Sequence, residues 1–154
     1  MLVMTAKVNK KKIAIIAAGV LAVVLAAILL FGGKDATPTS SITVSSNEDR
    51  VQFLNSFGWE VASSPIQTSQ VRIPAESSEV FTRYNALQKT MGYDLSAYAG
   101  KTVMRYVYTV KNYPGATEPV YATLLISGNQ VIGGDITDTA ATGLIQGFER
   151  IAKE

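Results

Sequence analysis

The feature that most constrains this chain is an uninterrupted apolar run near its start. Residues 13–31 (IAIIAAGVLAVVLAAILLF) contain no charged side chain. A helix of this length rises about 28 Å, close to the roughly 30 Å of a bilayer's hydrocarbon core. Because lipid offers the backbone no hydrogen-bond partners, a segment that spans it must be helical. The run therefore predicts one transmembrane helix, with the lipid bilayer as the partner of residues 13–31.

The lysines that precede this run predict its orientation. They are Lys7, Lys10, Lys11 and Lys12. Behind the run, Lys34 and Asp35 cancel each other, so the positive-inside rule places residues 1–12 in the cytoplasm and residues 34–154 outside it. The run is longer than the core of a cleaved signal peptide, and no clean cleavage site follows it. We therefore expect a single-pass protein of the cell membrane that keeps its anchor.

The charge balance separates the anchor from the rest of the chain. The whole sequence carries 14 basic and 12 acidic residues, a formal net charge of +2. Four of the basic residues are the flanking lysines, and all the acidic residues follow the apolar run, so the part outside the membrane is slightly acidic. No nucleic-acid partner is expected for such a domain.

Two missing residue types exclude whole classes of chemistry. The chain contains no histidine and no cysteine, which excludes Ser-His and Cys-His catalysis, thiol redox chemistry and His/Cys zinc sites. The sequence also lacks the Gly-rich motifs that cradle phosphates. It therefore predicts a protein that is not an enzyme and carries no cofactor.

The remaining chain divides into a linker and one domain. Residues 32–46 are rich in Gly, Ser, Thr and Pro and predict a flexible linker, and residues 47–154 predict an extracytoplasmic α+β domain. Its predicted elements are a helix after the N-cap Ser46, strands 59–62 and 67–73, a helix from Ser77 or Ser78 to Gly92, strands 101–112, 120–127 and 130–136, and a short helix over 139–151. The order is helix–strand–strand–helix–three-stranded antiparallel meander–short helix.

Periodicity and turn chemistry support these elements. Val80, Tyr84, Leu87 and Met91 recur at helical spacing, which predicts one apolar helix face. Residues 101–112 alternate with period two, as expected for a half-buried strand. Further on, Ser127-Gly128-Asn129 suits a tight hairpin turn.

Parts of this pattern resemble DUF4830, a domain family of unknown function. The similar segments are NEDRVQFLNSFGWEV (47–61), MGYDLSAYAGKTVMRYVYTV (91–110) and ISGNQVIGGDITD (126–138). Their markers are Phe-Gly-Trp after the first helix, Gly-Tyr-Asp-Leu after the second, and Gly-Gly-Asp after the hairpin. The resemblance covers most of residues 47–150. It implies an exported or membrane-anchored protein of Gram-positive (Bacillota) bacteria, and it supplies no catalytic residue.

The acidic residues after the hairpin are the first candidates for chemistry. Gly133-Gly134-Asp135 resembles the start of a diguanylate cyclase signature, but Ile136-Thr137 stands where that signature has its acidic pair. We expect a bulge or strand end at the glycines, and a turn or helix cap at Asp135 and Asp138. A weak calcium site is the alternative, although the spacing lacks the alternating oxygens of an EF-hand.

The tyrosines are the second candidates. A possible binding surface for glycan or peptide consists of Tyr106, Tyr108, Tyr113 and Tyr121. Tyrosines at such positions more often belong to a core, with their hydroxyls at its rim, and we favour that interpretation. Trp59 is expected to be a core anchor.

Three functions are compatible with these observations. The first is a non-catalytic binding or sensory module of the Gram-positive cell envelope, which binds a protein or cell-wall partner through an open sheet face or edge. The second is a carboxylate-dependent cell-wall hydrolase, which would need two acids at about 5–10 Å across one cleft. Its candidate acids are Asp135, Asp138, Glu60 and Asp94. The third is a structural protein that assembles laterally through its anchor.

Overall fold

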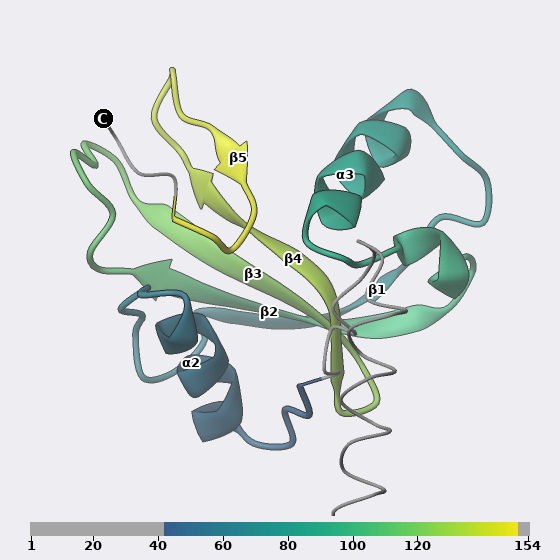
Figure 1. Cartoon of the computed structure of the whole chain (residues 1–154), viewed down its shortest axis with the longest axis horizontal. Helices are drawn as coiled ribbons and strands as arrows, with labels where there is room; N and C mark the ends of the chain where they lie inside the picture. The colour runs from purple at the N-terminus through teal and green to yellow at the C-terminus, as the bar shows by residue number, and fades with distance from the viewer. Residues whose placement is uncertain (1–41, 151–154) are drawn as a thin grey trace, which may run out of the picture. The chain divides into compact units, whose positions relative to one another are not determined.

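The computed structural model describes residues 42–150, which form an α+β fold. Its helices are α2 (Asn47–Ser56), α3 (Glu79–Thr90) and the 3₁₀ helix η1 (Leu95–Tyr98). Its strands are β1 (Gln67–Arg72), β2 (Thr102–Val110), β3 (Val120–Ser127), β4 (Gln130–Asp138) and β5 (Ile145–Gln146). The strands form one antiparallel sheet in the order β1-β2-β3-β4-β5 (Figure 1). The predicted α+β class is confirmed.

The predicted anchor lies outside the described residues. This holds for the transmembrane helix 13–31, for the basic tail 1–12 with its four lysines, and for most of the linker 32–46. None of the helices within residues 42–150 has the length and apolarity that a membrane crossing requires.

The first helix begins where its capping residues predict. Ser46 Oγ accepts a hydrogen bond from Asp49 N at 3.1 Å, and the Asp49 carboxylate accepts one from Ser46 N at 2.9 Å. This reciprocal pair satisfies backbone donors that a helix start leaves without partners. The same contacts lower the pKa of Asp49, the Ser46 backbone N–H most of all. Gly58 follows the helix with a φ of 84°, a conformation that glycine adopts without steric cost.

The two faces of the sheet contribute to two separate cores, because neighbouring strand residues point in opposite directions. Ala122, Leu124 and Ile126 of β3 pack on the side of α2. Trp59 and Phe148 complete this core, and Trp59 Nε1 donates to the Phe148 carbonyl at 2.6 Å. The C-terminal segment is thereby held on the α2 side.

The opposite face carries a smaller core beneath α3 and η1. It consists of Ile73, Leu95, Val103, Leu125 and Ile132, with Phe81 and Tyr84 of α3 against them. Figure 1 shows α2 and α3 lying far apart on the sheet. Because this second core is small, a large part of the α3-side face has no helix over it.

The predicted helix over residues 139–151 is wrong. The segment instead contains β5, whose Ile145 and Gln146 pair with Thr137 and Ile136 on the edge of β4. Ile145 is exposed, whereas Gln146 and Phe148 are buried, so the burial has period two. Backbone pairing of these two residues with β4 holds them in an extended conformation, and the Phe148 side chain packs into the α2-side core.

Three smaller differences concern segment ends. The predicted strand 59–62 is reduced to an isolated bridge between Val61 and Val110. The 3₁₀ helix η1 lies between the predicted helix that ends at Gly92 and the predicted strand that begins at residue 101. At the start, Val44 is only 2% exposed and its N–H donates to the Asn129 carbonyl, so the fold includes the end of the predicted linker.

Candidate functional site

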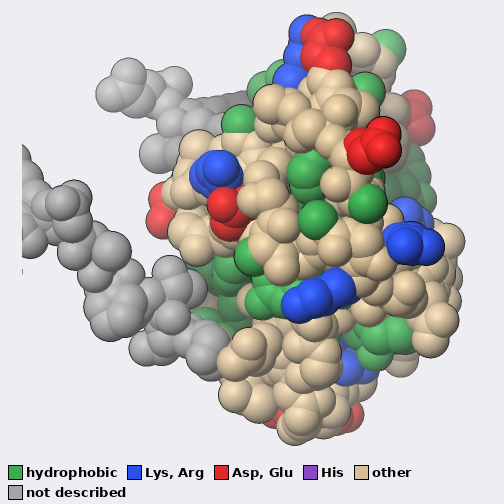
Figure 2. All heavy atoms as spheres, turned by 90° about the vertical axis from the view of Figure 1, so that its right-hand side faces the viewer, with side chains coloured by type: hydrophobic (Ala, Val, Ile, Leu, Met, Phe, Trp, Pro, Cys, Tyr) green, Lys and Arg blue, Asp and Glu red, His purple; other side chains and the backbone are tan. Residues whose placement is uncertain are grey.

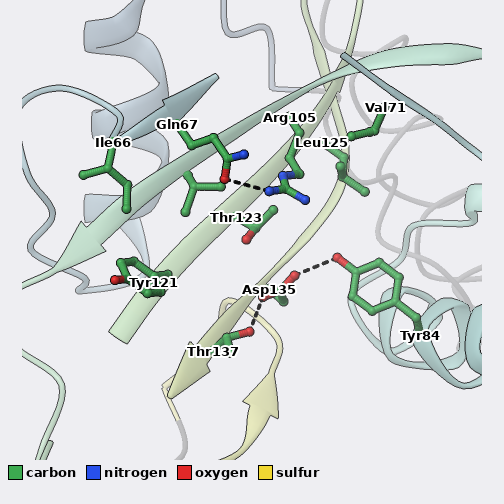
Figure 3. Close-up of a pocket in the computed structure, with 11 residues that line it drawn as sticks. Ile66, Gln67, Val71, Tyr84, Arg105, Tyr121, Thr123, Leu125, Asp135 and Thr137 are labelled. Carbon is green, nitrogen blue, oxygen red and sulfur yellow. Dashed lines mark hydrogen bonds between the residues drawn. The ribbon is translucent and has the colours of Figure 1, made fainter. Parts of the chain in front are cut away.

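The uncovered part of the α3-side face is a groove with a volume of about 650 Å³. Its floor comes from alternate residues of neighbouring strands, and its walls come from β1 and α3 (Figure 3). The lining residues are Ile66, Gln67, Val71, Tyr84, Arg105, Val107, Tyr121, Thr123, Leu125, Asp135 and Thr137. Four aliphatic side chains and two tyrosine rings thus share the groove with five polar or charged side chains. Ligand-binding pockets likewise combine apolar surface with polar groups that orient the ligand.

A bulge in β4 brings Asp135 into this groove. The register shifts between Leu125 and Ile126, which pair with Gly133 and Val131, so Ile132 is an extra residue. Asp135 then pairs with Thr123 and faces the groove. The prediction of a turn or cap at Asp135 is therefore wrong, because β4 continues through it. Asp138 does cap the following turn, where its Oδ1 accepts from Ala140 N at 3.0 Å.

The two glycines before Asp135 allow close approach on both faces of β4, Gly133 toward α3 and Gly134 toward β3 and Phe148. Gln88 is 0% exposed, its Nε2 donates to the Gly134 carbonyl at 2.9 Å, and its Oε1 accepts from Gly134 N at 2.8 Å. A Cβ at Gly133 would lie 2.6 Å from Gln88 Oε1, and one at Gly134 would lie 2.1 Å from the Thr123 carbonyl. One helical turn before Gln88, Tyr84 is thereby placed over Asp135.

Asp135 is a buried carboxylate that is only 7% exposed. Its Oδ2 accepts a hydrogen bond from the Tyr84 hydroxyl at 2.7 Å, and its Oδ1 accepts one from the Thr137 hydroxyl at 2.6 Å (Figure 3). Burial raises the pKa of Asp135, and these hydrogen bonds and the charge of Arg105 oppose that effect only in part. Burial, followed by the nearby Asp135 charge, also raises the pKa of Tyr84.

Arg105 is the basic group of the groove. Its Nη2 donates to Gln67 Oε1 at 2.8 Å, while its buried Nε finds no acceptor among residues 42–150. The ion pairs formed within that range are Arg83–Glu79 and Lys89–Asp94, so Arg105 forms none with a described acid. An arginine and a carboxylate therefore share one groove without neutralising each other by direct contact.

The four predicted tyrosines do not form one surface. Tyr108 is 0% exposed, and its hydroxyl accepts from Arg50 Nε at 2.9 Å. Tyr106 packs beneath the same guanidinium, 3.9 Å from its ring centroid, and Tyr113 stacks on Trp59 at 5.8 Å. These three tyrosines contribute to the α2-side core, whereas Tyr121 lines the groove on the opposite face.

The candidate acids are also dispersed. Asp94 caps η1, where it accepts hydrogen bonds from Asn85 Nδ2 at 2.9 Å and from Ser96 N at 3.0 Å. Asp138 caps a turn. Glu60 lies in the loop after α2, where its backbone carbonyl accepts a hydrogen bond from Lys111 N. Of the acids within residues 42–150, only Asp135 lines the groove. In this part of the chain, no three acidic side chains gather to hold a metal ion.

Several groove residues were not predicted from the sequence. Arg105 and Thr123 are polar residues within otherwise apolar or aromatic strands, and this was the available signal. In an antiparallel sheet with one solvated face, such residues mark the solvated side. The contribution of Tyr84 had no local signal, because it depends on how α3 lies over β4.

The fold and groove define a small α+β domain with a one-sided pocket, and comparison with known families is consistent with the resemblance noted above. The family model described as "Domain of unknown function (DUF4830)" matches residues 53–136. The chain belongs to this family. No curated protein and no solved structure matches the chain.

Proposed function

We propose that this protein is a membrane-anchored, extracytoplasmic binding module of the cell envelope, and that it holds its ligand in the groove without transforming it. The apolar run 13–31 and the lysines before it support the anchoring and orientation. The groove residues support the binding site.

The observation that carries the binding proposal is that the groove holds an arginine and a carboxylate that form no ion pair with each other. A buried donor without a partner, such as Arg105 Nε, costs about 1–3 kcal/mol, and native proteins rarely keep one. Asp135 adds a buried carboxylate on the same face. An apolar pair of similar size would stabilise this face better, so a ligand that meets both groups is the simplest reason to retain them.

The arrangement favours binding over carboxylate catalysis. Glycoside hydrolysis needs a second acid across the cleft from the first, and within residues 42–150 only Asp135 lines the groove. Both oxygens of Asp135 already accept hydrogen bonds from hydroxyl groups that hold it in place. A fixed carboxylate of this kind is suited to recognising a donor.

A photo-crosslinking experiment in the native host tests the proposal. Ile66 lines the groove and is exposed, so a photoreactive phenylalanine at this position should capture the ligand. The same residue at Gln52, which is exposed on α2 away from the groove, is the matched control. We expect a discrete adduct from position 66 that disappears with Arg105→Gln and does not form from position 52.

Two results would contradict this proposal. One is the absence of any adduct from position 66. The other is the same set of adducts from both positions, which would indicate random collisions at the membrane surface and no binding in the groove.

A further inference from the structure

A second depression lies beside the groove, on the other side of Tyr84. It is apolar, it has a volume of about 410 Å³, and its lining residues are Val80, Arg83, Tyr84, Leu87 and Ile145. Val80 is 79% exposed and Ile145 is 59% exposed, although both side chains are aliphatic. Tyr84 lines both depressions, so one ligand can occupy the two together.

Two charged groups inside the groove can select a ligand. Figure 2 shows the side of the molecule at the right of Figure 1, where hydrophobic side chains lie between basic and acidic ones. Charges of both signs are interspersed there, so this surface offers no broad field of one sign to attract a ligand. Arg105 and Asp135 are the charged residues that line the groove itself.

Arg105 fits a carboxylate. A guanidinium has five N–H donors in a planar fork, and the protein supplies one acceptor here, Gln67 Oε1. A carboxylate can meet the two terminal nitrogens of this fork with two parallel hydrogen bonds, whereas Nε itself is buried and out of a ligand's reach. A free multivalent anion fits less well, because Asp135 on the same floor would repel it.

Asp135 fits an N–H donor a short distance away. It lies on β4 and Arg105 lies on β2, so their backbones are separated by two strand spacings and an offset of two residues, roughly 12 Å in all. About three extended peptide residues, together with the reach of the two side chains, span this length. Each carboxylate oxygen can accept more than one hydrogen bond, so Asp135 keeps capacity for a backbone amide.

Resting on the proposed binding function, we infer that the ligand is a short peptide that binds through its free C-terminal carboxylate. Arg105 holds the carboxylate, and Asp135 accepts from a backbone N–H of the peptide. An apolar side chain about two residues before the C-terminus lies against Val80 and Ile145. Recognition of a terminal carboxylate by protein donors is an established mode of peptide binding.

The test uses the full-length protein in detergent and the probe N-acetyl-Leu-Ala-Gly, either as the free acid or as the C-terminal amide. Ligand-observed NMR measures the affinity of each. We expect the amide to bind at least about tenfold more weakly, because it leaves the guanidinium without an anionic partner. Arg105→Gln should remove this preference. Arg72→Gln makes the same change on β1 at a residue that does not line the groove, and should preserve the preference.

A second variant tests the apolar contact. Val80→Asp changes an exposed residue, so the fold should tolerate it. It should weaken binding of N-acetyl-Leu-Ala-Gly several-fold and leave N-acetyl-Gly-Ala-Gly unaffected. Equal losses for both probes would overturn the placement of the apolar side chain.

The outcomes separate this inference from the function on which it rests. Equal affinity for acid and amide, both lost in Arg105→Gln, would keep the groove as a binding site and overturn the carboxylate. If the Arg105-dependent adduct forms from position 66 but neither probe binds, the peptide inference is wrong and the proposed binding function stands. If neither probe binds and no adduct forms, both proposals fall.

Discussion

Two aspartates of this domain have opposite environments. Asp135 is buried, which raises its pKa, whereas hydrogen bonds from Asn85 and Ser96 lower the pKa of the exposed Asp94. Raising the pKa of an acid means that the folded state disfavours its charge, and lowering it means the reverse. The two side chains should therefore affect stability with opposite dependence on pH.

Asp135→Asn should stabilise the protein at pH 7. The ionised carboxylate is a cost to the native state at neutral pH, and this cost disappears as the pH falls through the native pKa toward the unfolded value of about 3.9. The advantage of Asp135→Asn should therefore shrink as the solution is acidified. Thermal unfolding followed by the fluorescence of Trp59, the only tryptophan in the sequence, measures the difference at each pH.

Asp94→Asn is the matched comparison. Wild-type Asp94 stabilises the folded state above the unfolded pKa, and this contribution is lost as the pH falls through the lowered native pKa. The variant should thus be less stable than wild type at pH 7 and approach it in acid. A pH profile with the same sign for both variants would show that burial does not govern Asp135.

At the scale of elements, α3 docks through amide side chains. Its buried residues are Asn85 and Gln88, while Val80 in its apolar stripe is exposed. Asn85 Oδ1 accepts from Leu95 N at 2.8 Å, and Gln88 pairs with both backbone groups of Gly134. Gln88 thereby acts like a short additional strand at the part of the β4 edge that β5 does not cover.

Gln88→Leu tests this docking. The change keeps the apolar volume but leaves the Gly134 N–H and carbonyl buried without partners, at about 1–3 kcal/mol each. We expect a loss of roughly 2–5 kcal/mol in the free energy of unfolding, measured with urea and Trp59 fluorescence, together with faster amide exchange at Gly134. Gln52→Leu, at an exposed position of α2, should change stability by less than about 0.5 kcal/mol. Equal stability of Gln88→Leu and wild type would rule out the edge role.

The elements set by local chemistry were predictable. Ser46 and Asp49 fix the start of α2, and Gly128 allows the turn between β3 and β4. The helix over 139–151 was mispredicted because Leu144, Ile145 and Phe148 have helical spacing, while the pairing that decides their conformation comes from β4. The glycines did indicate a bulge near this point, but Asp135 was misplaced because β4 continues past the bulge, and its pairing with β3 sets which way Asp135 faces.

At the scale of the whole molecule, sequence periodicity predicted a half-buried sheet but not its groove. Alternation in β2 identifies two faces, yet which part of a face stays open depends on how far α3 and η1 extend over it. That extent is set by long-range contacts such as Gln88–Gly134, which lie 46 residues apart in the chain. The family match likewise concerns residues 53–136 and does not bear on the anchor.

The orientation of the whole chain can be tested because it contains no cysteine. A single cysteine at Gln52, on the exposed face of α2, should react with a membrane-impermeant maleimide on intact cells. A single cysteine at Thr5 should react only after permeabilisation, because the positive-inside rule places the basic tail in the cytoplasm. Labelling of Thr5→Cys on intact cells, or protection of Gln52→Cys, would disprove the proposed topology.

The attachment of residues 42–44 to the β3–β4 hairpin has a mechanical consequence. Val44 N donates to the Asn129 carbonyl, and Thr43 forms an isolated bridge with Gln130. A pulling force on the chain before residue 42 would act on these two contacts first. They can break one at a time while the five-stranded sheet stays intact. Each residue released adds about 3.3–3.6 Å of reach. Under such a force, the extended chain ahead of the domain would therefore become longer before any strand of the sheet unfolds.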